Sequence, residues 1–197
     1  MIKSPIPKVT NNKQFRAIGI VFGMYKPIDN NLLNKGFIED SSGLNIDAVV
    51  LGKALPLIKK FINFENKYYW IVYPRNKNSD NIHLQIAGIW DPNNFKNNDE
   101  NIKKTHDLLL SLDLKDNLFS IRGKLIFINT QEKDLIIKIC PSRQNKNKKN
   151  KSFKILVKGE ISMKYINSFV SLEVIRKDNT LFMEKFEIIE AKASEIN

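Results

Sequence analysis

The stretch IDAVVLGKALPLIKKFINFENKYYWIVYPR (46–75) decides the fold, because it places one short helix between two strands. Both ends, IDAVV and KYYWIVYPR, are rich in β-branched and aromatic residues, as strands usually are. Between them, ALPLIKKFI (54–62) has apolar residues at helical spacing, and Pro56 is tolerated there only in a first helical turn. The stretch therefore predicts strand, helix and strand in that order.

Three further strands surround this unit in the first half of the chain. FRAIGIVFGMY (15–25) predicts a long first strand, and GFIEDSSGLNIDAVVLGK (36–53) predicts two strands that flank the turn EDSSG. NIHLQIAGIW (81–90) predicts a fifth strand after a turn-rich connection. Five strands with a helix between the third and the fourth form the order of an oligonucleotide-binding (OB) barrel.

The second half of the chain repeats this order without residue-level identity to the first half. A short helical turn again follows the third strand; the segments are LFSIRGKLIFI (118–128), DLIIKICPS (134–142), FKILVKGE (153–160), ISMKYIN (161–167), FVSLEVIR (169–176) and TLFMEKFEIIE (180–190). We therefore predict a β-rich fold of two tandem OB-like five-stranded barrels, each with a short helix between strands 3 and 4. The alternative is one larger β-rich domain.

Composition places the boundaries of these parts. We expect an N-terminal arm (1–14), a first OB-like domain (15–92), a linker with a short helix (93–117), a second OB-like domain (118–192) and a C-terminal tail (193–197). The linker helix is amphipathic, and its leucines are expected to help the two barrels pack together. The opening MIKSPIPKV lacks the apolar run of a secretory signal, so we expect a cytoplasmic protein.

The net charge of +11 and the pI of about 9.6 favour a polyanionic partner. Lys, Asn and Ile are all abundant, as AT-rich codon use alone would produce, so the location of the charge is more informative than its total. Residues 118–197 hold 16 basic and 9 acidic side chains. RQNKNKKNKSFKILVKGE (143–160) is the densest region, with seven cations before its single acid.

Strand alternation brings many of these cations to one predicted face. If Ile121, Leu125 and Phe127 point into the core, Arg122 and Lys124 point out, and the same reasoning applies to the next two strands. These are the strands on which OB barrels bind oligonucleotides. The predicted nucleic-acid-binding residues, including those of the loop at 143–152, are Arg122, Lys124, Lys138, Arg143, Lys146, Lys148, Lys149, Lys151, Lys154 and Lys158.

Binding of single strands also needs aromatic surfaces on which bases stack. Phe127 and Phe153 fall in the inward phase of the second half, and Phe169 falls in the outward phase of its strand. In the first half, Tyr69, Tyr73 and Arg75 share one phase of a strand and are the predicted stacking residues. Outward tyrosines are also common simply because tyrosine favours strands.

Few residues suit catalysis or metal binding. His83 and His106 have no further ligand at metal spacing, and Cys140 has no base beside it. Glu39 and Asp40 lie in a predicted turn, where Asp is favoured for backbone reasons. We therefore predict a protein that is not an enzyme and that uses no cofactor or metal.

The chain resembles a functionally uncharacterised family of cyanobacterial proteins, most clearly in its first half. The residues that carry the resemblance are FRAIGIVFGMYKP (15–27), IDAVVLGKALPLIKKF (46–61), YYWIVYPR (68–75) and NIHLQIAGIWDP (81–92), and, more loosely, IRGKLIF (121–127), SFKILVKGE (152–160) and SLEVIRKDNTL (171–181). The resemblance implies a soluble cyanobacterial protein and transfers no activity, ligand or site residue.

These observations favour a non-catalytic protein that binds RNA or single-stranded DNA, mainly through phosphate contacts on a basic sheet face and loop of the second barrel. The alternative is a protein-interaction or assembly module, in which an acidic protein partner neutralises 143–158 and the tyrosine surface makes a second contact. Lys on exposed strands also discourages edge pairing, so a purely structural origin of the basic face stays open.

Overall fold

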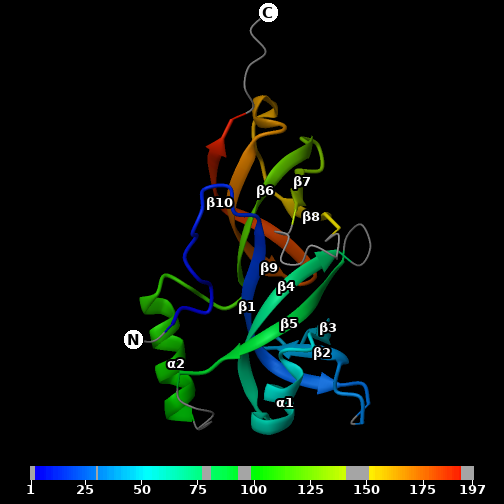
Figure 1. Ribbon diagram of the computed structural model, residues 1–197, viewed down its shortest axis with the longest axis vertical. Coiled ribbons are helices and arrows are strands. Elements are labelled where there is room, and N and C mark those ends of the chain that lie inside the picture. Colours follow the sequence, from blue (N-terminus) through cyan, green and yellow to red (C-terminus); the bar gives the residue numbers. More distant parts are fainter. Residues whose placement is uncertain (1–2, 30, 77–80, 93–98, 141–150, 192–197) are drawn as a thin grey trace, which may run out of the picture. The chain divides into compact units, whose positions relative to one another are not determined.

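The computed structural model describes residues 3–29, 31–76, 81–92, 99–140 and 151–191. The chain divides into two compact units. Unit 1 comprises Met1–Pro7, Ile18–Arg75 and Ile82–Leu118, and unit 2 comprises Lys8–Ala17, Asn76–Asn81 and Phe119–Asn197. The fold class predicted from the sequence, two tandem OB-like barrels, is confirmed (Figure 1).

Unit 1 is a closed five-stranded barrel. Its strands are β1 (Arg16–Pro27), β2 (Lys35–Asp40), β3 (Asn45–Val50), β4 (Lys67–Asn76) and β5 (Ile82–Trp90), with helix α1 (Leu55–Phe61) between β3 and β4. The strands pair in the order β1-β2-β3-β5-β4-β1, and β3 pairs with β5 in parallel. Pro56 lies in the first turn of α1, as its missing N–H requires.

Unit 2 has the same topology. Its strands are β6 (Leu118–Asn129), β7 (Asp134–Ile139), β8 (Phe153–Lys158), β9 (Phe169–Lys177) and β10 (Thr180–Glu190). They pair in the order β6-β7-β8-β10-β9-β6, and the contact of β8 with β10 is again parallel. The predicted helical turn at 161–167 is a single 3₁₀ turn, η1 (Met163–Tyr165). Strand order and helix position thus agree in the two halves, although the sequences do not.

Helix α2 (Asp99–Ser111) packs on unit 1. Leu109 is fully buried there with Ile20, Tyr69 and Trp90, and Leu108 and Leu112 pack against the same cluster. These leucines, expected from the sequence to help the two barrels pack together, are part of the core of unit 1. The helix covers the outward-facing side chain of Tyr69, so β4 is buried on both faces near this residue.

No helix in the described part of the chain combines the length and apolarity needed to span a lipid bilayer.

Candidate nucleic-acid interface

Three lysines form one row across unit 2. In the antiparallel register of β6, β7 and β8, Lys124 lies opposite Lys138, and Lys138 lies opposite Lys154. Directly opposite residues share one face of a sheet, with Cβ atoms about 4.5–5.5 Å apart. Lys124 and Lys154 are exposed and Lys138 is partly exposed. The alternation predicted from the sequence therefore does bring these three cations together, and we call them the lysine row.

The lysines face water because their neighbours along the three strands point into the core. Leu125, Ile137 and Ile155 lie opposite one another and are fully buried in the barrel core. Because side chains alternate between the two faces, burying these three residues sends their neighbours outward. Like charges placed directly opposite one another destabilise a sheet, so the lysine row costs the folded protein stability.

A β-bulge lies one step further along β6 and changes the phase of that strand. The register shifts between Leu125 and Phe127, so that Ile126 is the extra residue and Phe127 lies opposite Ile136. The prediction that Phe127 points inward is wrong for this reason, since its side chain is 45% exposed. Phe127, Ile136 and the opposite Leu156 form an apolar row beside the lysine row.

Lys158 shares the outer face but is not a free cation. It lies opposite Asp134, whose carboxylate is 2.6 Å from the Lys158 ammonium, and it also donates to the carbonyl of Glu132. This ion pair ends the positive region toward the β6–β7 turn. Lys151 is exposed just before β8. Arg143, Lys146, Lys148 and Lys149 lie outside the described residues.

Arg122 does not have the exposure predicted for it. Its side chain is only 5% exposed, because residues 12–15 of the chain cover this part of the outer face of unit 2. The guanidinium donates to the carbonyls of Asn12 (2.7 Å) and Gln14 (3.4 Å). Burial is the main cause that lowers its pKa, while the nearby carboxylate of Glu187 acts in the opposite direction. Phe169, expected to point to solvent, is buried by the same segment.

The predicted stacking residues of unit 1 differ in exposure. Tyr69 is buried under α2, where its hydroxyl lies 2.8 Å from Nδ1 of His106, and burial is the main reason that its pKa is raised. It is therefore not an exposed stacking surface. Tyr73 and Arg75 are partly buried, and burial lowers the pKa of the Arg75 guanidinium. The stacking role of these two residues stays a prediction.

The row of unit 1 that corresponds to the lysine row has no cation on β1, β2 or β3. Gly23 and Gly123 occupy equivalent places, since a Cβ would lie 2.5 Å from the Glu39 carbonyl in one barrel and 2.4 Å from the Lys138 carbonyl in the other. The residues that directly follow these glycines, Met24 and Lys124, are therefore equivalent as well. In unit 1 this row contains Met24, Glu39 and Asn45, and Glu39 pairs with Lys26. The two barrels share a fold but differ in charge at this position.

Asp40 of unit 1 has a structural role in the turn after β2. Asp40 is buried, and its Oδ1 accepts hydrogen bonds from the backbone N–H groups of Ser42 (2.9 Å) and Leu44 (3.1 Å) and from the Ser42 hydroxyl. This is the turn geometry that the sequence predicted. Within the described ranges, no group of three or more His, Cys, Asp or Glu side chains is placed to hold a metal ion.

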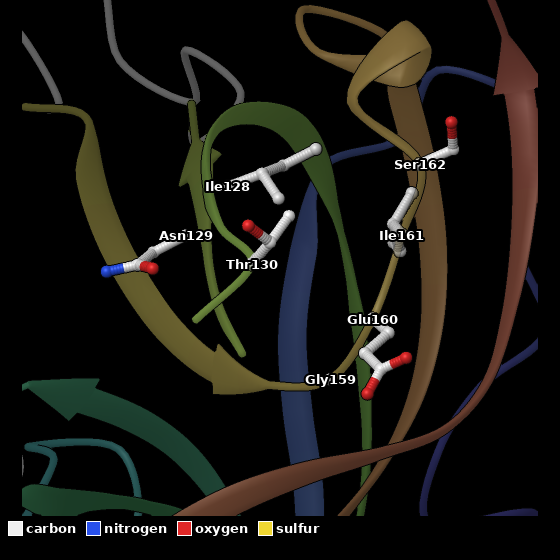
Figure 2. Close-up of a pocket in the computed structure, with 7 residues that line it drawn as sticks. All are labelled: Ile128, Asn129, Thr130, Gly159, Glu160, Ile161 and Ser162. Atoms are coloured by element: carbon white, nitrogen blue, oxygen red, sulfur yellow. The ribbon is translucent and has the colours of Figure 1, made fainter. Parts of the chain in front are cut away.

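A pocket of about 340 Å³ lies at the end of β6, between the β6–β7 turn and the segment after β8 (Figure 2). Its lining includes Thr130, Ile161 and the carboxylate-bearing Glu160. Glu160 pairs with Lys133 at 2.5 Å, and this hydrogen bond is the main cause that lowers the carboxyl pKa. The charged side chain that lines this pocket is the Glu160 carboxylate, and it already pairs with Lys133, so the lysine row suits a nucleic-acid backbone better.

Topology and charge thus define a protein with two OB barrels, one of which carries a basic outer face. Residues 17–97 match the domain family described as PatR RNA-binding protein, N-terminal OB-fold domain. Residues 121–190 match the family described as cyanobacterial OB-fold-like RNA-binding domain, C-terminal. Each half of the chain thus matches an OB-fold domain family, and these matches confirm the resemblance noted in the sequence. A search of curated proteins found no match.

Proposed function

We propose that this protein is a non-catalytic RNA-binding protein whose principal contact surface is the outer face of unit 2. In this proposal the lysine row binds phosphates of a single strand, and the exposed ring of Phe127 stacks on a base. The observation that carries the proposal is the register of β6, β7 and β8, which places three lysines directly opposite one another.

The energetic argument supports a ligand rather than a purely structural role. Each of the two opposed lysine pairs is destabilising in the free protein, and a row of phosphates would neutralise both. The equivalent row of unit 1 contains Glu39 between neutral residues, so the fold does not require cations there. RNA is the favoured ligand because both family descriptions name RNA binding.

Phe127 gives the proposal its second element. Its ring is exposed one outward step from Lys124, because the bulge at Ile126 shifts the phase of β6. Base stacking on an aromatic side chain contributes about 1–3 kcal/mol per base and tolerates any base. Stacking requires an unpaired base, and the combination therefore favours single-stranded segments over duplex.

Fluorescence anisotropy of a labelled single-stranded RNA 20-mer tests the proposal in the full chain. Replacement of all three lysines of the row by glutamine should reduce the magnitude of the log–log salt slope by about 2, since each phosphate contact on a single strand contributes about 0.7. The matched control replaces Lys53, Lys59 and Lys103, three exposed lysines of unit 1, and removes the same charge. Equal losses in the two triple variants would show that binding follows net charge and not this face.

A further inference from the structure

Residues 12–15 cover a cation and an aromatic ring on the outer face of unit 2. We call these residues the strap. The backbone carbonyls of Asn12 and Gln14 accept hydrogen bonds from the Arg122 guanidinium, and the ring of Phe15 packs edge-on against Phe169 with centroids 5.0 Å apart. The Arg122 guanidinium carbon lies 6.0 Å from the centroid of the Phe169 ring. The strap thus contacts both the Arg122 guanidinium and the Phe169 ring.

Arg122 and Phe169 have the chemistry of a nucleotide site. A guanidinium binds phosphate through a planar fork of donors, and a phenylalanine ring stacks on bases. Arg122 lies two residues before Lys124 on the same face of β6, a separation of about 7 Å along a strand. A strand of RNA that leaves the lysine row in this direction reaches Arg122 next.

The strap is a weak occupant of this position. The two carbonyls that face Arg122 are neutral, whereas a phosphate would offer a charged acceptor and a stronger hydrogen bond. The guanidinium groups of Arg16 and Arg122 lie close enough to repel each other. The Arg16 guanidinium also donates a hydrogen bond to the Ser120 hydroxyl at 3.0 Å. The strap is also held by the ion pair of Lys13 with Glu190, but both side chains are largely exposed, so this pair contributes little.

We propose that Arg122 and Phe169 form a covered second nucleotide-binding site for the same RNA strand, and that the strap occupies this site until RNA displaces it. The inference rests on the proposed function, because it extends the RNA path beyond the lysine row. Displacement replaces the carbonyls of the strap by phosphate oxygens and the ring of Phe15 by a base. In the free protein the strap carbonyls therefore accept the hydrogen bonds of the buried Arg122 guanidinium. In the complex, phosphate oxygens accept them instead.

Limited trypsin digestion of the full chain tests this displacement without any variant. Trypsin cleaves after Lys13, within the strap, and cleavage is followed by mass spectrometry with and without a saturating uridine 20-mer whose binding is verified by anisotropy. RNA should accelerate cleavage after Lys13 several-fold and leave cleavage after Lys103 of unit 1 unchanged. Unchanged or slower cleavage after Lys13 with RNA bound overturns the strap proposal and leaves the proposed function intact. Failure of the 20-mer to bind at any salt concentration overturns both.

Variants supply a second readout. Phe15→Ala removes the ring contact of the strap, so the site is open in a larger fraction of molecules and RNA affinity should rise by roughly threefold or more. Arg122→Gln added to Phe15→Ala should abolish that gain and reduce the magnitude of the salt slope by about 0.7. Phe61→Ala, which removes a partly exposed ring from α1 of unit 1, is the control and should leave affinity unchanged. Equal or weaker binding by Phe15→Ala contradicts the proposal.

Discussion

Replacement of the central lysine of the row, Lys138→Gln, should stabilise the free protein and weaken RNA binding. Lys138 has a lysine on each side, at Cβ separations of about 5 Å. Two unit charges about 5 Å apart in water repel by about 0.8 kcal/mol before screening, and salt at 0.15 M with a Debye length of about 8 Å roughly halves this. Lys138 takes part in two such pairs, but the ammonium groups splay further apart than the Cβ atoms. We therefore expect the replacement to raise the unfolding free energy of unit 2 by about 0.5–1 kcal/mol at low salt.

The assay must report on unit 2 specifically. Both tryptophans, Trp70 and Trp90, lie in unit 1, so their fluorescence follows that barrel alone. Hydrogen exchange of the amides of β7 and β8, measured at increasing urea, gives the stability of unit 2. The gain should fall below about 0.3 kcal/mol in 1 M salt, where the Debye length is about 3 Å.

The matched control is Lys35→Gln. Lys35 is also an exposed strand lysine, but its partner across the sheet is Val49, so its replacement relieves no repulsion. The same Lys138→Gln protein should bind single-stranded RNA with a salt slope smaller in magnitude by about 0.7. A loss of stability in Lys138→Gln, or a gain that does not depend on salt, would refute the electrostatic reasoning.

Three further predictions concern single positions. Phe127→Ala should weaken binding of the RNA 20-mer by about 1–3 kcal/mol with an unchanged salt slope, and Phe127→Trp should bind at least as well as wild type; a changed slope would contradict a stacking role. Gly123→Ala should destabilise unit 2 and weaken RNA binding, because the new Cβ would lie 2.4 Å from the Lys138 carbonyl; Gly52→Ala, where nothing lies within 4 Å, is the control for both measurements. Burial raises the pKa of Tyr25 to about 12, above the ordinary value of 10.0, so the stability that this tyrosine contributes is complete below pH 10 and is lost as pH rises through about 12. Alkaline unfolding monitored by tryptophan fluorescence should therefore be shallower in Tyr25→Phe, and an identical pH profile would contradict the assignment.

The sequence predicts the strand order and the lysine row because both depend on local patterns. Hydrophobic alternation with a period of two fixes which side of a strand faces the core, and Lys124, Lys138 and Lys154 follow that rule. The helix between the third and fourth strands of the first half likewise follows from local spacing and from Pro56, and the second half has a single 3₁₀ turn at that place.

The errors arise where a second element or a bulge overrides the alternation. Phe127 changes face because Ile126 is an extra residue in β6, and a bulge leaves little trace in a single sequence. Arg122 and Tyr69 have the outward phase that was predicted, but the strap covers the first and α2 covers the second. Segments distant in sequence cover these outward side chains, and the alternation of residues within one strand carries no information about such tertiary contacts.

Crosslinking of bound RNA tests the central claim most directly. Ultraviolet irradiation of the full protein with a uridine-containing single strand, followed by digestion and mass spectrometry, locates the crosslinked residues. We predict that the crosslinks map to the outer face of β6, β7 and β8, with Phe127 and the lysine row among the modified positions. Crosslinks confined to unit 1, around Met24 and Glu39, would contradict the assignment of RNA binding to the second barrel.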